Sequence, residues 1–166
     1  IRVTFHRCTF ESMLEIVLEP VLLAVGTLLG LVGMEALGWF IHKYLMHGPL
    51  WFIHRTHHRP SGKGPEWNDL FSLLFGGLGM GLWWWGLEDR PLVLGTGVGI
   101  CLYGALYFIM HDGWVHRRWR VPMRSRFPYI EAMIRAHRAH HVSLKAKPSE
   151  SYGLLWFPSK FLIKKP

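Results

Sequence analysis

The stretch HKYLMHGPLWFIHRTHH, residues 42–58, holds five of the chain's eleven histidines and decides how the rest of the sequence is interpreted. Five more histidines lie in HDGWVH, residues 111–116, and HRAHH, residues 137–141. The eleventh, His6, belongs to no cluster, and we expect a structural role for it. Because the pattern H-x-x-H-H occurs twice, the clustered histidines are a strong candidate for a metal-binding motif.

The spacing of the clustered histidines predicts how they share metal ions. In an α-helix, positions i, i+3 and i+4 lie on one face, so each H-x-x-H-H triplet is expected to aim at a common point. Histidines five residues apart are separated by about 140° around an α-helix, so each H-x-x-x-x-H pair is expected to bridge two neighbouring sites. The candidate metal ligands are His42, His47, His54, His57, His58, His111, His116, His137, His140 and His141.

Ten imidazoles exceed the needs of one ion, because zinc takes about four ligands and octahedral iron about six. Two ions with about five nitrogens each fit the number. The two cysteines, Cys8 and Cys101, are too few for a disulfide framework or an iron–sulfur cluster. Imidazole binds iron, zinc, copper and nickel, so the ligand type alone leaves the identity of the metal open.

The composition indicates a membrane protein. Half of the 166 residues are hydrophobic while the net charge is +8, which excludes a disordered chain and disfavours an ordinary soluble domain. Three stretches approach the roughly 20 apolar residues that cross a bilayer, namely 20–41, 70–87 and 92–110. Allowing for one partial element near the amino terminus, we expect an all-α integral membrane helical bundle with three to four membrane helices.

The order of these segments predicts a topology. Residues 88–91 are too few for anything except a turn, so the histidines before residue 70 and those after residue 110 must lie on the same side of the bilayer. Basic residues are abundant around the histidines, whereas the turn carries only Arg90. By the positive-inside rule, we expect the histidines to form a di-metal cap on the cytoplasmic face.

A chain of 166 residues has the length of one domain. We expect residues 1–166 to form a single membrane-embedded domain, with 1–15 as a variable amino-terminal extension and 143–166 as a carboxyl-terminal tail. The basic run 117–126 is expected to face lipid head groups or to dock an acidic ferredoxin. Binding to nucleic acid fits poorly with membrane spans.

The setting of the histidines favours oxidation chemistry. No carboxylate base stands beside an evident polar pocket, which disfavours a hydrolytic zinc pair, and a membrane would deliver an apolar substrate. Attack on an unactivated C–H bond calls for dioxygen at a redox metal, so a di-iron centre is the favoured interpretation. Asp112, Asp69 and Asn68 are candidates to accept hydrogen bonds from ligating histidines. Glu35, inside an apolar span, is a candidate for the same role or for a helix–helix hydrogen bond.

These residues resemble the bacterial non-haem di-iron carotenoid hydroxylases, of the beta-carotene 3-hydroxylase type, within the fatty acid hydroxylase and sterol desaturase superfamily. The likeness spans roughly residues 34 to 142 and fades beyond them, where 150–155 read ESYGLL. It rests on Glu35, HKYLMHG at 42–48, the histidines of 54–58, NDLF at 68–71, YG at 103–104, LYF at 106–108, HDG at 111–113, VH at 115–116, RW at 118–119, AHR at 136–138 and HH at 140–141.

The resemblance implies an integral membrane enzyme that uses O2 and a reduced electron carrier to hydroxylate the rings of beta-carotene, giving cryptoxanthin and then zeaxanthin. It also implies that all ten clustered histidines bind two iron ions. Zinc could take the place of iron in purified protein. No Gly-rich dinucleotide fingerprint follows a predicted strand, so a separate ferredoxin or similar donor with its reductase is expected. The expected partners are this donor, a carotenoid and the lipid bilayer, without nucleic acid.

Two other interpretations stay open. The chain could be a hydroxylase or desaturase of a fatty acyl or sterol lipid within the same superfamily. It could also be a non-catalytic membrane protein that binds metal ions, in which case its function would not depend on oxygen.

Overall fold

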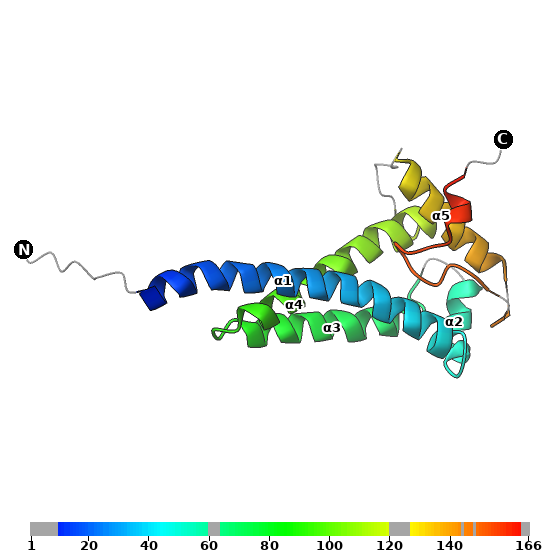
Figure 1. Cartoon of the computed structure of the whole chain (residues 1–166). Helices are drawn as coiled ribbons and strands as arrows, with labels where there is room; N and C mark the ends of the chain where they lie inside the picture. The colour runs from blue at the N-terminus through cyan, green and yellow to red at the C-terminus, as the bar shows by residue number, and fades with distance from the viewer. Residues whose placement is uncertain (1–9, 60–63, 120–126, 144, 148, 164–166) are drawn as a thin grey trace, which may run out of the picture.

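The computed structural model describes residues 10–59, 64–119, 127–143, 145–147 and 149–163. The regular elements in these ranges are all helices, which confirms the predicted all-α class (Figure 1). Two of them, η1 and η2, are π-helical and continue α1 and α4. The elements are α1 (Phe10–Phe40), η1 (Ile41–Met46), α2 (Trp51–His58), α3 (Asp69–Gly86), α4 (Pro91–Tyr107), η2 (Phe108–Val115), α5 (Pro128–Val142) and the short η3 (Ser159–Phe161).

Helices α1 and α3 both pack against α4, through contacts that require glycine. A Cβ atom on Gly26 of α1 would lie 2.2 Å from the carbonyl oxygen of Leu92 in α4. A Cβ atom on Gly97 of α4 would lie 2.3 Å from the backbone nitrogen of Trp83 in α3. The helix backbones therefore touch directly, as small residues allow in membrane helices.

Among the described residues, two helical segments are long and apolar enough to cross a membrane, Met13–Met46 and Pro91–Val115. They contain the first and third predicted spans. The second predicted span, 70–87, forms α3, but this helix of 18 residues is not one of the two segments. Its glycines and its three tryptophans lower its mean hydropathy. The count of three to four membrane helices therefore stays a prediction.

The turn between α3 and α4 lies at one end of the bundle, and α2 and α5 lie at the other (Figure 1). Helices α2 and α5 carry six of the clustered histidines. Histidines from before residue 70 lie next to histidines from after residue 110. Both sets therefore lie at one end of the α3–α4 hairpin, as the prediction of a shared side of the bilayer requires.

Several predictions concern residues outside the described ranges. His6 and residues 120–126 of the basic run belong to these, as do residues 1–9 of the predicted amino-terminal extension. Residues 10–15, also assigned to that extension, form the first turns of α1.

Candidate metal centre

All ten predicted ligands meet at one end of the bundle, in two groups of five that we call site A and site B. Within each site, every histidine offers one ring nitrogen, and the five nitrogens lie within 4.8 Å of one another. Site A consists of His42, His47, His54, His58 and His140, and site B consists of His57, His111, His116, His137 and His141.

Each H-x-x-x-x-H pair contributes both of its histidines to one site, which corrects the prediction that a pair bridges two sites. The reason is the π-helical backbone of η1 and η2. In a π-helix, the N–H of residue i+5 bonds to the C=O of residue i, so the two side chains leave the same side. The N–H of His47 donates to the carbonyl of His42 at 3.0 Å, and the N–H of His116 donates to the carbonyl of His111 at 2.9 Å.

Each H-x-x-H-H triplet is divided between the sites, which corrects the prediction that it converges on one point. In α2, the first and last histidines serve site A, and the middle one, His57, serves site B. In α5 the assignment is reversed, and the middle histidine, His140, serves site A. Around an α-helix, position i+4 lies about 40° to one side of position i, whereas i+3 lies about 60° to the other side. The middle histidine therefore points toward the neighbouring site.

The two sites share one construction. Each takes an i, i+5 pair from a π-helical segment, an i, i+4 pair from one α-helix and a single histidine from the other α-helix. Because α2 and α5 each contribute to both sites, these helices fix the spacing between them. The donors come from distant parts of the chain, so the complete centre exists only in the folded protein.

In site A, Nδ1 is the ring nitrogen that does not face the other histidines, and we call the group to which it donates the outer partner. These partners are neutral oxygen acceptors, including four backbone carbonyls and one side-chain amide. A carbonyl oxygen only accepts, so each Nδ1 carries the proton and each Nε2 presents a lone pair. The pairs are His42 with Tyr152 (2.6 Å), His47 with Ala146 (2.7 Å), His58 with Ser143 (2.9 Å), His140 with Glu150 (2.7 Å) and His54 with Oδ1 of Asn68 (2.7 Å).

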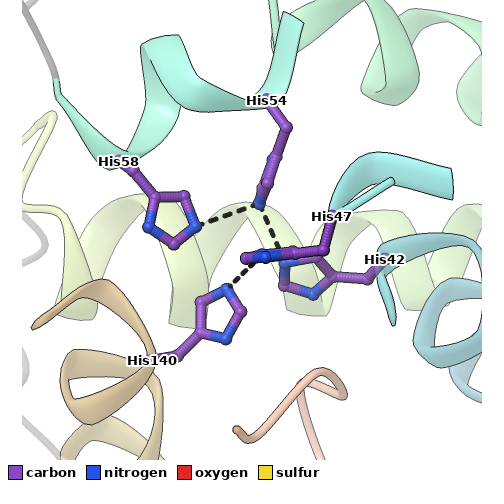
Figure 2. A group of neighbouring side chains, drawn as sticks. All are labelled: His42, His47, His54, His58 and His140. Atoms are coloured by element: carbon purple, nitrogen blue, oxygen red, sulfur yellow. Dashed lines mark hydrogen bonds between the residues drawn. The ribbon is translucent and has the colours of Figure 1, made fainter. Parts of the chain in front are cut away.

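The lone pairs of site A face one another at short range (Figure 2). Nε2 of His54 lies 2.9 Å from Nε2 of His42 and 3.2 Å from Nε2 of His58. Nε2 of His47 lies 3.0 Å from Nε2 of His140. Two lone pairs at such distances repel each other unless a cation lies between them. A metal bound by imidazoles at about 2.0–2.1 Å places neighbouring nitrogens about 3 Å apart, so the donor set fits a metal ion.

In site B, two histidines have charged outer partners. Nδ1 of His57 donates to Oε2 of Glu66 at 2.9 Å, and Nδ1 of His111 donates to Oδ1 of Asp112 at 2.7 Å. The Nε2 atoms of these two histidines lie 3.1 Å apart. A carboxylate behind an imidazole fixes its tautomer and makes it a stronger ligand. Nδ1 of His137 is buried and has no hydrogen-bond partner in the described part of the chain.

Burial keeps the rings neutral. It lowers the pKa of His54 to about 3 and the pKa values of His58 and His116 to about 4. The rings are therefore uncharged near neutral pH, and no proton is available between the facing nitrogens. A metal ion is the cation that satisfies this donor set, because imidazole binds metals in its neutral form.

The predicted hydrogen-bond acceptors occupy different positions. Asp112 accepts from His111, and Asn68 accepts from a site A histidine, as described above. Asp69 instead accepts two hydrogen bonds from Arg118, at 2.6 and 2.7 Å, and has no hydrogen bond to a histidine within the described ranges. Nη1 of Arg118 also lies 3.7 Å from Oδ2 of Asp112, and Oδ2 of Asp69 accepts from the backbone N–H of Glu66 at 2.9 Å. Asp69 is therefore connected to site B indirectly, through Arg118 and through Glu66.

Two parts of the site are not identified by the sequence analysis. One is Glu66, which lies nine residues after His57, and the spacing of the residues gives no sign that the intervening loop brings them together. The other is the backbone of 143–152, whose carbonyls hold four histidines of site A. A backbone acceptor has no residue-type signature, so only the fold reveals it.

An apolar cavity of about 710 Å³ leads to the histidines. Its walls include Met34 of α1, Met80 of α3 and Ile100 of α4, and histidines of both sites line it as well. Tyr107 also lines it and places its hydroxyl oxygen 3.1 Å from Nε2 of His111. The volume lies within the range of ligand pockets, so an apolar group in the cavity would meet both sites.

Comparison with known proteins identifies similar chains in bacteria and plants. The fatty acid hydroxylase family model matches residues 27–159, which include all ten histidines. The chain is 37% identical over 127 residues to a beta-carotene hydroxylase of Pantoea ananas, across 76% of this chain and 73% of the relative. It is 34% identical over 131 residues to a beta-carotene hydroxylase of Paracoccus sp. (strain PC1), across 75% and 78%.

A plant relative shows comparable similarity over a smaller share of its length. The chloroplastic beta-carotene 3-hydroxylase of an Oncidium hybrid cultivar is 40% identical over 123 residues, across 72% of this chain and 39% of the relative. No solved structure matches the chain.

Proposed function

Because this chain belongs to the fatty acid hydroxylase family, we propose that it hydroxylates the ring of a carotenoid at two iron ions held by sites A and B. The relatives in bacteria and plants bear the name of this activity. The observation that carries the proposal is the position of two five-nitrogen donor sets at the end of an apolar cavity. Beta-carotene would be converted to cryptoxanthin and then to zeaxanthin.

The chemistry requires a redox metal and an external electron donor. Bound iron would supply the activation of dioxygen, by which one oxygen atom enters a C–H bond of the ring. The other oxygen atom leaves as water, so each turnover consumes two electrons and two protons. We propose that a ferredoxin or similar carrier with its reductase delivers the electrons. Zinc, which has no redox chemistry, could occupy the same ligands without supporting the reaction.

The residues of the cavity bind and orient the ring. Met34, Met80 and Ile100 present apolar surface to a hydrocarbon and exclude water from it. The ring carbon to be attacked is held beside the histidines, while the polyene body extends among α1, α3 and α4. Such fixed placement is a large part of catalysis, because it avoids the entropic cost of bringing the reactants together.

The outer partners of the histidines hold protons in fixed positions. The Nδ1 proton of His111 is retained by Asp112, and that of His57 is retained by Glu66, so both Nε2 atoms stay available to a metal. Arg118 lies beside Asp112 and is itself held by Asp69. We assign Asp112 a direct role in positioning a metal ligand and Asp69 an indirect one.

The proposal includes a location. The helical bundle would lie in a lipid bilayer as one domain, with α3 as a third span beside α1 and α4. The histidines would lie on the cytoplasmic face, as the basic residues around them favour. A soluble electron donor can reach them there, and a carotenoid can enter the cavity from the lipid.

Expression in bacterial cells that accumulate beta-carotene tests the activity. We expect cryptoxanthin and zeaxanthin by chromatography and mass spectrometry, and we expect the His137→Ala variant to form neither. His6→Ala is the matched control, because it removes the histidine that lies outside the sequence clusters, and it should retain the activity. Immunoblotting of the membrane fraction shows whether the variants insert equally.

Other products would identify the alternatives. New hydroxylated or unsaturated acyl lipids or sterols, without any xanthophyll, would replace the carotenoid with another apolar substrate. No oxygen-dependent product at all, with metal still bound, would favour a metal-binding protein without catalysis. Undiminished product from His137→Ala would refute the assignment of site B.

A further inference from the structure

Glu35 is a buried acidic residue in an apolar helix, seven positions before the first ligand of site A, and only 9% of its surface is exposed. A buried carboxylate is costly unless several donors satisfy it. Oε1 of Glu35 accepts hydrogen bonds from the backbone N–H of Leu155 at 2.9 Å and from that of Trp156 at 2.7 Å. Oε2 accepts one from the hydroxyl of Tyr103 at 2.8 Å.

These contacts fasten a distant segment, residues 149–157, which we call the C-terminal strap. The donors are backbone N–H groups, so these bonds fix the backbone of the strap and do not depend on a particular side chain. Gly153 lies against the same carboxylate. A Cβ atom there would lie 2.5 Å from Oε1 of Glu35 and 2.5 Å from the carbonyl oxygen of Trp156. The strap therefore fits closely around Glu35, and position 153 requires glycine.

The strap also supports site A. The carbonyl of Tyr152 accepts from Nδ1 of His42, and the carbonyl of Glu150 accepts from Nδ1 of His140. Ser149 adds a contact of 2.8 Å between its hydroxyl oxygen and the same nitrogen of His140. Among the described residues, the histidines of site B form no hydrogen bond to the strap, and the outer partners of His57 and His111 are Glu66 and Asp112.

We propose that Glu35 is a positioning residue that fastens the C-terminal strap and thereby keeps site A, but not site B, ready to bind its metal ion. The inference rests on the proposed function, in which both sites hold ions. When the strap detaches, His42 and His140 lose the acceptors that fix their tautomer and orientation. Site B keeps its own outer partners and its ion.

Two variants that break the contact from opposite sides test this proposal. Glu35→Ala removes the acceptor from α1, and Gly153→Ala pushes the strap away while leaving the carboxylate in place. Glu19→Ala is the matched control, because Glu19 is an exposed acidic residue in the same helix. Tyr103→Phe removes only the bond between α1 and α4, so it separates loosening of the strap from loosening of the helices.

Two readouts are taken on the iron-loaded full chain in detergent. Hydrogen exchange at the amides of Leu155 and Trp156 should be at least about tenfold faster in Glu35→Ala and Gly153→Ala, since a buried charge-assisted hydrogen bond is lost. Elemental analysis should give about half the iron content per chain of the unaltered protein. Glu19→Ala and Tyr103→Phe should keep the full content.

Several outcomes would overturn the inference. Full iron content with a freely exchanging strap would show that the strap does not hold site A. Unchanged exchange would show that Glu35 does not fasten it, and loss of all iron would show a general effect on the fold. An equal effect of Tyr103→Phe would assign the role to the helix contact. Failure of the proposed function is distinct, because the unaltered chain would then lack iron or form no xanthophyll.

Discussion

Sites A and B are built by one rule and surrounded by different groups. Both combine an i, i+5 pair, an i, i+4 pair and a single histidine. The outer partners described for site A are neutral oxygen atoms, whereas those for site B are the carboxylates of Glu66 and Asp112. The comparison separates two properties of a metal centre. Helix geometry sets which nitrogens lie together in one site, and the outer partners would set how strongly that site holds an ion.

The hydrogen-bond acceptors of the two sites also lie in different parts of the fold. Four acceptors of site A, the carbonyls of Ser143, Ala146, Glu150 and Tyr152, follow α5 and belong to no helix or strand. The acceptors of site B lie next to helices, since Asp112 belongs to η2 and Glu66 precedes α3 by three residues. We therefore expect site A to be the more easily emptied of the two.

The largest effect is expected when the middle histidine of an H-x-x-H-H triplet is removed. This histidine serves a different site from the other two histidines of its triplet. His140→Ala should empty site A, and His57→Ala should empty site B. Either change should lower product formation at least about 100-fold, because removing a ligand should cost at least as much as the 10- to 100-fold loss typical of removing its outer partner. In elemental analysis, the double variant of His57 and His137 should keep one ion, since both belong to site B, whereas the double variant of His57 and His140 should keep none.

The reverse result in the two double variants would contradict the division of the triplets. An ion retained without His57 and His140, but lost without His57 and His137, cannot arise from the sites described here.

A smaller effect is expected from the outer partners. Asp112→Asn keeps an acceptor for His111 but removes its charge, so site B should lose about 10- to 100-fold in metal affinity while site A is unchanged. Asn68→Asp makes the opposite change behind His54 and should strengthen site A. Competition with a chelator, followed over time for each variant, measures both. Equal weakening of the two sites by Asp112→Asn would show that the charge acts on the fold as a whole.

The smallest effect is expected from a change of pH. It should alter the stability of the metal-free protein through the histidines of both sites alike. Burial lowers the folded-state pKa of His58 in site A and of His116 in site B to about 4, from an ordinary value of 6.5. The unfolded metal-free chain therefore binds more protons than the folded chain between these values, so stability present above pH 6.5 is lost as the pH falls toward 4. Thermal unfolding of the metal-free protein at several pH values checks this. Greater stability at pH 5 than at pH 7 would contradict the neutral buried rings.

The sequence identifies the histidines of the centre but not their division. Their clustering marks all ten, because the patterns H-x-x-H-H and H-x-x-x-x-H each occur twice. The assumption of α-helical geometry then assigns them wrongly, since η1 and η2 are π-helical and bring His42 with His47, and His111 with His116, onto one side. Nothing in the residue types of these segments indicates the wider helix.

Long-range partners are the other part that the sequence does not reveal. Glu35 is recognisable as an acidic residue in an apolar span, and its bond to Tyr103 is the predicted helix–helix contact. Its bonds to Leu155 and Trp156 involve backbone N–H groups about 120 residues away, which every non-proline residue possesses. The sequence therefore predicts only a carboxyl-terminal tail for residues 143–166, although their described part supports site A.

The division of the histidines into two sites can be tested by the position of iron in crystals of the iron-loaded protein, located by anomalous diffraction. We expect two peaks, one surrounded by the five nitrogens of site A and the other by the five of site B. A single peak, or a peak bound together by His54, His57 and His58, would contradict it.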